Sequence, residues 1–128
     1  MPLLSRFPTA ALLLSTLLAL AGCAHRPPVT GAFGDARTLD VGEATVFEDG
    51  LLLKLEGIAD SRCRPGLVCV WAGELSPQLR LSGGRFGDAP VALSLGTGRG
   101  RDRQTGGYRF QLLQATPTTA TLVVTPAQ

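Results

Sequence analysis

The chain of 128 residues contains a single histidine, His25, and no apolar run that reaches the roughly 18 residues of a transmembrane helix. A Ser-His-Asp or Cys-His catalytic arrangement needs a histidine beside its nucleophile, and zinc sites normally combine histidine with cysteine. The 12 basic residues are nearly balanced by 10 acidic ones, which does not suit a nucleic-acid-binding protein. We therefore expect no enzymatic activity, no metal, no cofactor, no spanning helix and no nucleic acid partner.

Residues 1–22 are organised like a secretory signal peptide. A basic segment ends at Arg6, and an apolar run follows from Ala10 to Ala21. This run is too short to span a bilayer in the mature protein, but it suits the apolar region of a signal peptide. The small residues Ala21 and Gly22 then fit the cleft of a signal peptidase.

The four residues at the end of this segment, Leu20-Ala21-Gly22-Cys23, resemble the lipobox of bacterial lipoproteins. The resemblance implies that Cys23 carries a thioether-linked diacylglycerol with acyl chains such as palmitate, and that it becomes the N-terminus after cleavage. Stable anchoring to a membrane follows from two or more acyl chains. The alternative is an ordinary signal peptide that is cut near residue 21 or 24, with Cys23 incidental.

Ala24, rather than aspartate, follows the expected anchor. In Gram-negative lipoproteins aspartate at this position is a retention signal for the inner membrane. The resemblance therefore implies a lipid-anchored protein of the cell envelope, at the outer membrane and facing the periplasm if the organism is Gram-negative.

Residues 23–37 are expected to form a flexible, lipidated tether, because Pro27, Pro28, Gly31 and Gly34 interrupt any periodic pattern. Residues 38–128 are sufficient for one small domain with a modest core.

Short alternating runs separated by turn residues predict an all-β domain from residue 38 onward, a small antiparallel sandwich or barrel of about 7–8 strands. Asp49-Gly50 predicts a hairpin, and Gly57 predicts a bulge because Ile58 falls out of phase. Residues 96–107 are expected to be a polar loop. The expected strands are 38–41, 44–47, 51–58, 67–71, 77–82, 91–95, 108–112 and 119–125.

Cys63 and Cys69 are six residues apart and, if Cys23 carries lipid, each has only the other as a partner. In an exported protein this favours a structural disulfide, whose short ring contributes roughly 2.4 kcal/mol through chain entropy. A redox-active or metal-binding thiol pair is the alternative, although no CxxC spacing is present.

The two cysteines lie in the most distinctive segment of the chain, Asp60-Ser61-Arg62-Cys63 followed by Cys69-Val70-Trp71-Ala72-Gly73. This segment resembles a family of small, largely uncharacterised bacterial exported proteins, and the resemblance covers residues 38–125. It implies a disulfide-tied β-domain and supplies no catalytic assignment. Arg64 stands between Cys63 and Pro65, one residue more than the family pattern has.

Within this segment Pro65-Gly66 predicts a tight turn, after which Val68, Val70 and Trp71 are expected to return to the core. An exposed Trp71 that stacks on a ligand is the alternative. A candidate recognition surface consists of Asp60, Arg62, Arg64 and Trp71; the alternative is a set of solvated charges with a local ion pair.

Glycines at 96, 98 and 100 resemble a phosphate-binding loop only superficially, because no GK[ST] sequence or helix follows them. A flexible loop is the preferred interpretation. Its arginines at 99, 101 and 103 are weaker candidates for contact with anionic lipid or cell-wall polymer.

Together these features predict a lipid-anchored, non-catalytic envelope protein, a structural or binding module of unknown ligand. Its expected partners are the membrane, through Cys23, and an envelope protein or the cell wall. The alternative is a protease inhibitor that presents Arg62 or Arg64 from a disulfide-closed loop. A weak enzyme or metal binder is a third class, and no motif supports it.

Overall fold

The computed structural model describes Gly22 and residues 26–128 of the chain, so the predicted signal peptide (Gly22 aside), the lipidation at Cys23 and His25 lie outside the described residues. In the described part, no helix is long and apolar enough to cross a membrane. The elements are β1 (Val29–Gly31), β2 (Arg37–Asp40), β3 (Ala44–Phe47), β4 (Leu52–Asp60), β5 (Leu75–Ser82), the 3-10 turn η1 (Gly84–Phe86), β6 (Val91–Ser94), β7 (Asp102–Thr105), β8 (Tyr108–Ala115) and β9 (Thr119–Pro126).

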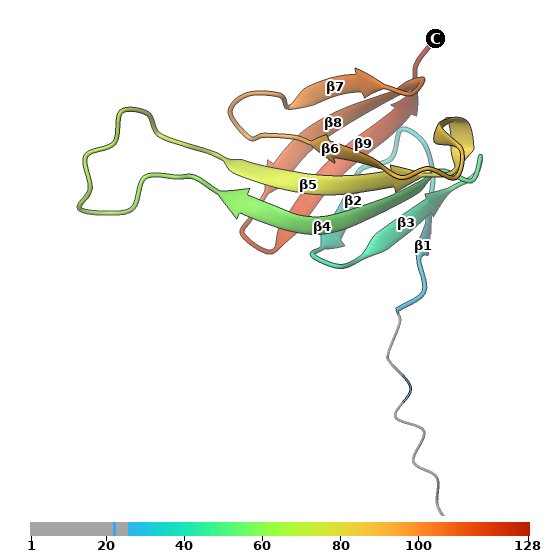
Figure 1. Cartoon of the computed structure of the whole chain (residues 1–128), viewed down its shortest axis with the longest axis horizontal. Helices are drawn as coiled ribbons and strands as arrows, with labels where there is room; N and C mark the ends of the chain where they lie inside the picture. Colours follow the sequence, from blue (N-terminus) through green and yellow to red (C-terminus); the bar gives the residue numbers. More distant parts are fainter. Residues whose placement is uncertain (1–21, 23–25) are drawn as a thin grey trace, which may run out of the picture.

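The strands form two sheets that pack face to face as a sandwich (Figure 1). One sheet has the order β1-β3-β4-β5-β6 and the other has the order β2-β9-β8-β7. Neighbouring strands are antiparallel except for β1, which pairs in parallel with β3. The predicted all-β fold is confirmed, and of the two architectures expected the structure is the sandwich.

Alternate residues of facing strands fill the space between the sheets, because successive side chains of a strand point to opposite faces. The expected inward faces of β4, β8 and β9 are confirmed, and Lys54 on β4 points outward to solvent. Apart from Leu75, the buried apolar residues form one cluster, with Leu51, Leu53, Leu55, Leu79, Leu81, Phe110, Leu112, Ala120, Leu122 and Val124 among its members. The sandwich therefore has a single apolar core.

The hairpin turn and the β-bulge predicted from the sequence are both present in the structure. The hairpin at Asp49-Gly50 joins β3 to β4, with the Gly50 amide donating to the Phe47 carbonyl at 3.0 Å. The register between β4 and β5 shifts between Leu55 and Gly57, which confirms the predicted bulge. Beyond the bulge Ile58 packs against the core.

Tyr108 closes one end of the core. Its ring stacks against Phe33 and Phe86, with centroids 6.0 Å and 5.6 Å away. Its hydroxyl donates a hydrogen bond to the Asp49 carboxylate and accepts one from the Arg85 amide at 2.9 Å. Burial, and then the Asp49 hydrogen bond, raise the pKa of Tyr108 above its usual value.

Two strands lie where the sequence predicts irregular chain. β1 falls within the stretch 23–37 that was expected to be a tether, and Phe33 stacks on Phe47 with centroids 5.0 Å apart, so the ordered sandwich already includes residues 29–37. β7 falls in the predicted polar loop 96–107 and pairs with β8 at the edge of its sheet. Both strands are short edge strands whose residues contribute little to the core, so neither has an apolar periodicity.

Candidate functional site

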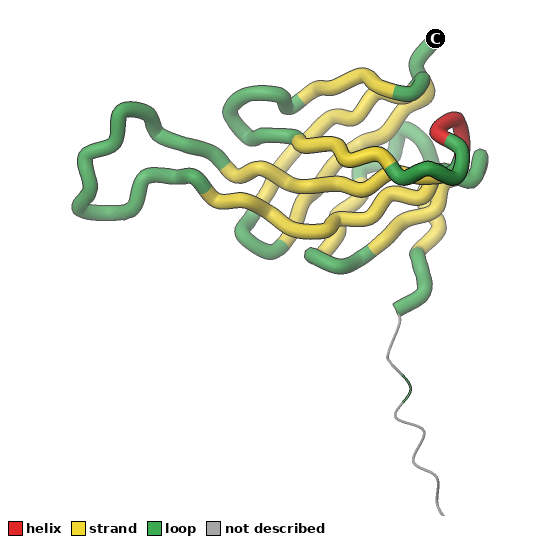
Figure 2. The backbone as a smooth tube through the Cα atoms, viewed as in Figure 1, coloured by secondary structure: helices red, strands yellow, loops and turns green. Residues whose placement is uncertain are grey.

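Residues 61–74 connect β4 to β5 and project well beyond the two sheets, as Figures 1 and 2 show. We refer to these residues as the arm. They include both cysteines and most of the distinctive segment of the sequence. The predicted strand at 67–71 is wrong, because the arm is irregular along this stretch.

The base of the arm continues the antiparallel pairing of β4 and β5. The Ser61 amide donates to the Glu74 carbonyl at 2.9 Å, and the Cys63 amide donates to the Ala72 carbonyl at 3.1 Å. The Ser61 hydroxyl accepts from the Glu74 amide at 3.0 Å. Gly73 has a φ of +71°, and a Cβ there would lie 1.9 Å from the Ser61 carbonyl oxygen, so this position of the motif requires glycine.

A disulfide between Cys63 and Cys69 closes the end of the arm into a ring, with 5.9 Å between the two Cα atoms. This confirms the predicted pairing. Inside the ring the Leu67 amide donates to the Arg64 carbonyl at 3.2 Å, and Gly66 has a φ of +83°. Proline followed by a glycine of positive φ suits a type II turn, so the predicted turn at Pro65-Gly66 is also confirmed.

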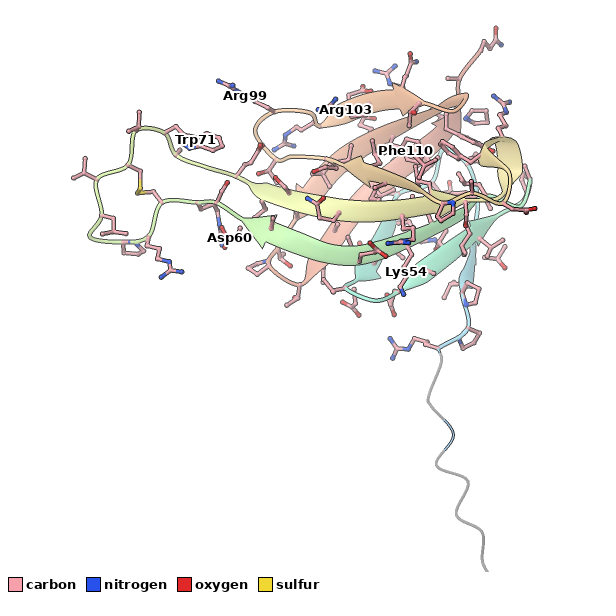
Figure 3. The ribbon with its side chains drawn as sticks, in the orientation of Figure 1. Lys54, Asp60, Trp71, Arg99, Arg103 and Phe110 are labelled. Carbon is pink, nitrogen blue, oxygen red and sulfur yellow. A yellow bond between two sulfur atoms is a disulfide. The ribbon has the colours of Figure 1, made fainter. Side chains whose placement is uncertain are left out.

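The arm holds four of the seven large apolar side chains that are exposed in the described part of the chain. Val68 and Val70 are fully exposed, Leu67 is 62% exposed and Trp71 is 55% exposed. Figure 3 shows Trp71 outside the two sheets and Phe110 between them. The prediction that Val68, Val70 and Trp71 enter the core is therefore wrong, and the exposed Trp71 of the alternative is the arrangement observed.

The reason for this error is the length of chain between the two strands. β4 ends at Asp60 and β5 begins at Leu75, and these two strands already span the core. The residues that connect them therefore lie past the end of the sandwich. Leu67, Val68 and Val70 were not among the predicted site residues. The sequence signal that marks them is the short ring between Cys63 and Cys69, which contains Leu67 and Val68 and directly precedes Val70.

The charged members of the predicted recognition surface gather at one side of the arm. The Arg62 guanidinium donates to both carboxylate oxygens of Asp60, at 2.9 Å and 2.8 Å, and the Arg62 amide donates to the same carboxylate at 3.0 Å. These contacts, with a weaker contribution from Arg64, lower the pKa of Asp60 to about 2. An open hollow of about 440 Å³ is lined by Asp60, Arg62, Cys63, Arg64 and Pro65, and Trp71 does not line it.

The glycine-containing loop between β6 and β7, residues 96–101, is held by Glu74 at the base of the arm. We refer to it as the glycine loop. The Glu74 carboxylate accepts from the amides of Gly98 and Arg99, each at 2.8 Å. The hydrogen bonds from the Arg99 and Gly98 amides, and more weakly the Arg99 charge, lower the pKa of Glu74 below its usual value, and partial desolvation opposes them.

The glycine loop therefore binds an anion that belongs to the protein itself. Its superficial likeness to a phosphate-binding loop has this physical basis, since backbone amides that converge on one point attract any anionic oxygen. The expectation of a flexible loop differs from the structure, in which the Thr97 amide also donates to the Leu75 carbonyl at 3.0 Å. In Figure 3 Arg99 lies on the outer side of this loop.

A small cavity of about 60 Å³ lies where β1 and β3 of one sheet meet β2 of the other. Arg26 and Glu43 form an ion pair at its wall with a 2.6 Å contact, and buried Thr45 lines it with an Oγ1 that has no hydrogen-bond partner. A volume of this size suits a few water molecules, whereas sites for small organic ligands occupy several hundred Å³.

Among the residues that the structure describes, no three histidine, cysteine or acidic side chains are grouped so that they could hold a metal ion. The arm is therefore the feature that we take as the candidate site. Comparisons of the chain with protein-family models, with curated proteins and with solved structures find no significant match to any of them.

Proposed function

We propose that this protein is a lipid-anchored, non-catalytic binding module of the bacterial cell envelope, with the arm as its binding element. The signal segment and Leu20-Ala21-Gly22-Cys23 support the anchor. The arm supports the binding role. Its partner is the membrane itself, an envelope protein or the cell wall.

The observation that carries the proposal is the concentration of exposed apolar side chains on the arm, whose backbone is held by a disulfide and by hydrogen bonds at its base. Leu67, Val68, Val70 and Trp71 lie together within five residues, and all four are exposed. Exposed apolar patches on soluble proteins frequently mark interaction sites. The disulfide and the paired base hold the patch in position, which reduces the conformational entropy lost on binding.

Three carboxylates at or near the arm and the edge strand β7 are held in their charged form by neighbouring donors. The pKa values of Asp60, Glu74 and Asp102 are all lowered, by the Arg62 guanidinium, by loop amides and by the Arg109 guanidinium respectively. A general acid needs a pKa near the working pH, and a lowered pKa makes a carboxyl group less suited to this role. These three carboxylates are therefore poor candidates for a general acid, which supports the non-catalytic part of the proposal.

The protease-inhibitor alternative gains no support from the geometry of the arm. Arg62 is held by Asp60 through two side-chain contacts. The Arg64 carbonyl accepts the hydrogen bond that closes the turn, whereas a protease cleft binds an extended segment.

Mass spectrometry of the protein purified from membranes of cells that express the full chain tests the proposal. We expect the chain to begin at Cys23 and to carry the mass of a diacylglycerol group. An unmodified Cys23, or a chain that begins at another residue, would refute the lipid anchor. Turnover in a broad screen of hydrolase and thiol-redox substrates would refute the non-catalytic role.

A photo-crosslinking residue in place of Val70 tests the arm as the binding element, and the same residue in place of Val41 is the control. Both valines are exposed, but Val41 lies directly after β2, away from the arm. We expect crosslinks in the envelope from position 70 only. Equal crosslinking from both positions would contradict the proposed role of the arm.

A further inference from the structure

We infer that the arm inserts its apolar tip into the lipid interface of the membrane to which Cys23 is anchored. The tip consists of Leu67, Val68, Val70 and Trp71. This inference rests on the proposed lipid anchor, and it names the ligand of the arm as a bilayer surface.

The residue types of the arm fit the boundary between lipid headgroups and acyl chains. Valine and leucine side chains gain from leaving water, and tryptophan is enriched at membrane interfaces because its indole has an apolar ring and a polar N–H. Arg62 and Arg64 lie on the same arm and are exposed. Asp60 neutralises Arg62, and Glu74 is held by loop amides at the base of the arm, so Arg64 places a positive charge in the ring beside the tip, where anionic lipids attract it.

The position of the expected anchor keeps the sandwich close to the bilayer. Cys23 precedes Arg26 by three residues, which span at most about 10 Å of extended chain. Arg26 is itself held against the sandwich by the 2.6 Å contact with Glu43. The sandwich therefore lies on the membrane surface, and the arm that projects from the sandwich can reach the bilayer.

The arm can extend further than this tether. From Ser61 to Leu67, six residues later, the chain spans at most about 20 Å when extended. Figure 1 shows the arm and the described N-terminal end emerging from separate sides of the sandwich, neither covered by the other. A second contact through the arm would fix the orientation of the body on the membrane, which the anchor alone does not.

The backbone of the tip sets the depth of insertion. The tip is irregular, and its amide and carbonyl groups need water or headgroup partners because the hydrocarbon interior offers none. Insertion is therefore restricted to the interfacial region, where side chains enter the boundary and the backbone stays hydrated. The disulfide and the base pairing keep the four side chains from folding back onto the sandwich.

The single tryptophan of the chain is Trp71, so tryptophan fluorescence reports on the arm alone. The test uses the acylated, full mature protein, reconstituted in vesicles of phosphatidylethanolamine and phosphatidylglycerol. We expect a blue shift of the Trp71 emission relative to a secreted form without acyl groups in dilute buffer. We also expect quenching by lipids that carry bromine near the headgroup end of the acyl chain, and weaker quenching by bromine near the bilayer centre.

Matched variants distinguish the contribution of the arm to membrane insertion from that of other exposed residues. Val70→Asp is expected to abolish the blue shift, and Val41→Asp is expected to leave it unchanged, since both side chains are exposed and neither substitution disturbs the core. Arg64→Gln is expected to lower the insertion equilibrium constant about fivefold on anionic vesicles and to have little effect on vesicles of phosphatidylcholine. Circular dichroism of each variant confirms that the sandwich is folded.

The outcomes distinguish this inference from the proposed function. An acylated protein in vesicles whose Trp71 emission equals that of the form without acyl groups would refute insertion and leave the anchor intact, whereas a membrane preparation of the full chain without acyl groups would refute the anchor. A blue shift that depends on protein concentration without lipid would identify a second copy as the occupant and overturn the inference. A blue shift that requires added envelope protein would overturn it as well.

Discussion

Replacing Cys63 and Cys69 with serine opens a ring that lies entirely within the arm. Cys23 is left unchanged, so that the expected anchor is retained. The loop-entropy relation for a ring of seven residues gives about 2.4 kcal/mol of stabilisation, provided that the open chain is ordered again in the folded protein. The exposed position of the ring predicts that this condition fails.

The ring is exposed and lies outside the sandwich, so the opened segment gains nearly the same freedom in the folded protein as in the unfolded chain. Cys69 and its neighbours Val68 and Val70 are exposed, and no member of the core cluster belongs to the arm. The conformational entropy that ring opening adds to the unfolded chain is therefore largely matched by the entropy that it adds to the folded protein. We expect the free energy of unfolding of the sandwich to fall by less than about 1 kcal/mol.

Urea titration followed by far-ultraviolet circular dichroism measures this change in the sandwich. Amide hydrogen exchange at position 63 measures the arm, because the Cys63 amide bonds the Ala72 carbonyl. In the double variant the amide at this position is expected to exchange faster, while that of Leu53 in the core exchanges as before. A fall of about 2 kcal/mol or more, with faster exchange at both positions, would refute the separation of the arm from the sandwich.

Three further predictions concern side-chain contacts of known geometry. Tyr108→Phe is expected to lower the free energy of unfolding by about 1–3 kcal/mol in urea, because two part-buried hydrogen bonds lose the Tyr108 hydroxyl; an unchanged midpoint would contradict this. Since the pKa of Tyr108 is raised above 10.0 in the folded protein, its contribution is complete below pH 10 and declines above it, and the phenylalanine variant should lack this decline. Arg62→Gln is expected to return the pKa of Asp60 from about 2 toward 3.8 in a carbon-13 titration; in the wild type the contact is complete above pH 3.8 and is lost as the pH falls through about 2. Glu74→Gln is expected to speed amide exchange in the glycine loop without changing that of β8, and equal rates in the loop of both proteins would exclude the carboxylate as its support.

The sandwich could be predicted from the sequence because its strands are half-buried. Strict alternation in β4, β8 and β9 places leucine, phenylalanine and valine on one face, and the buried residues are the ones that the alternation selects. β1 and β7 could not be predicted in this way. They lie at sheet edges, where backbone hydrogen bonds pair β1 with β3 and β7 with β8. Such pairing does not depend on the side chains, so the two strands have no periodic pattern of apolar residues.

The candidate site was predicted only in part. Spacing was sufficient for the disulfide and for the turn at Pro65-Gly66, because both depend on residues close in sequence. The exposure of Trp71 depends on where the sheets end, which is a property of the whole fold. Glu74 and the glycine loop are more than 20 residues apart, and only the pairing of β5 with β6 brings them together.

The first strand sets a practical limit for any shortened form of this protein. A chain that began at residue 38 would leave β3 as an unpaired edge, which invites edge-to-edge aggregation. It would also uncover the rings of Phe47 and Tyr108, on which Phe33 now stacks. A secreted variant without lipid should therefore retain the residues from Val29 onward, with the leader fused ahead of them.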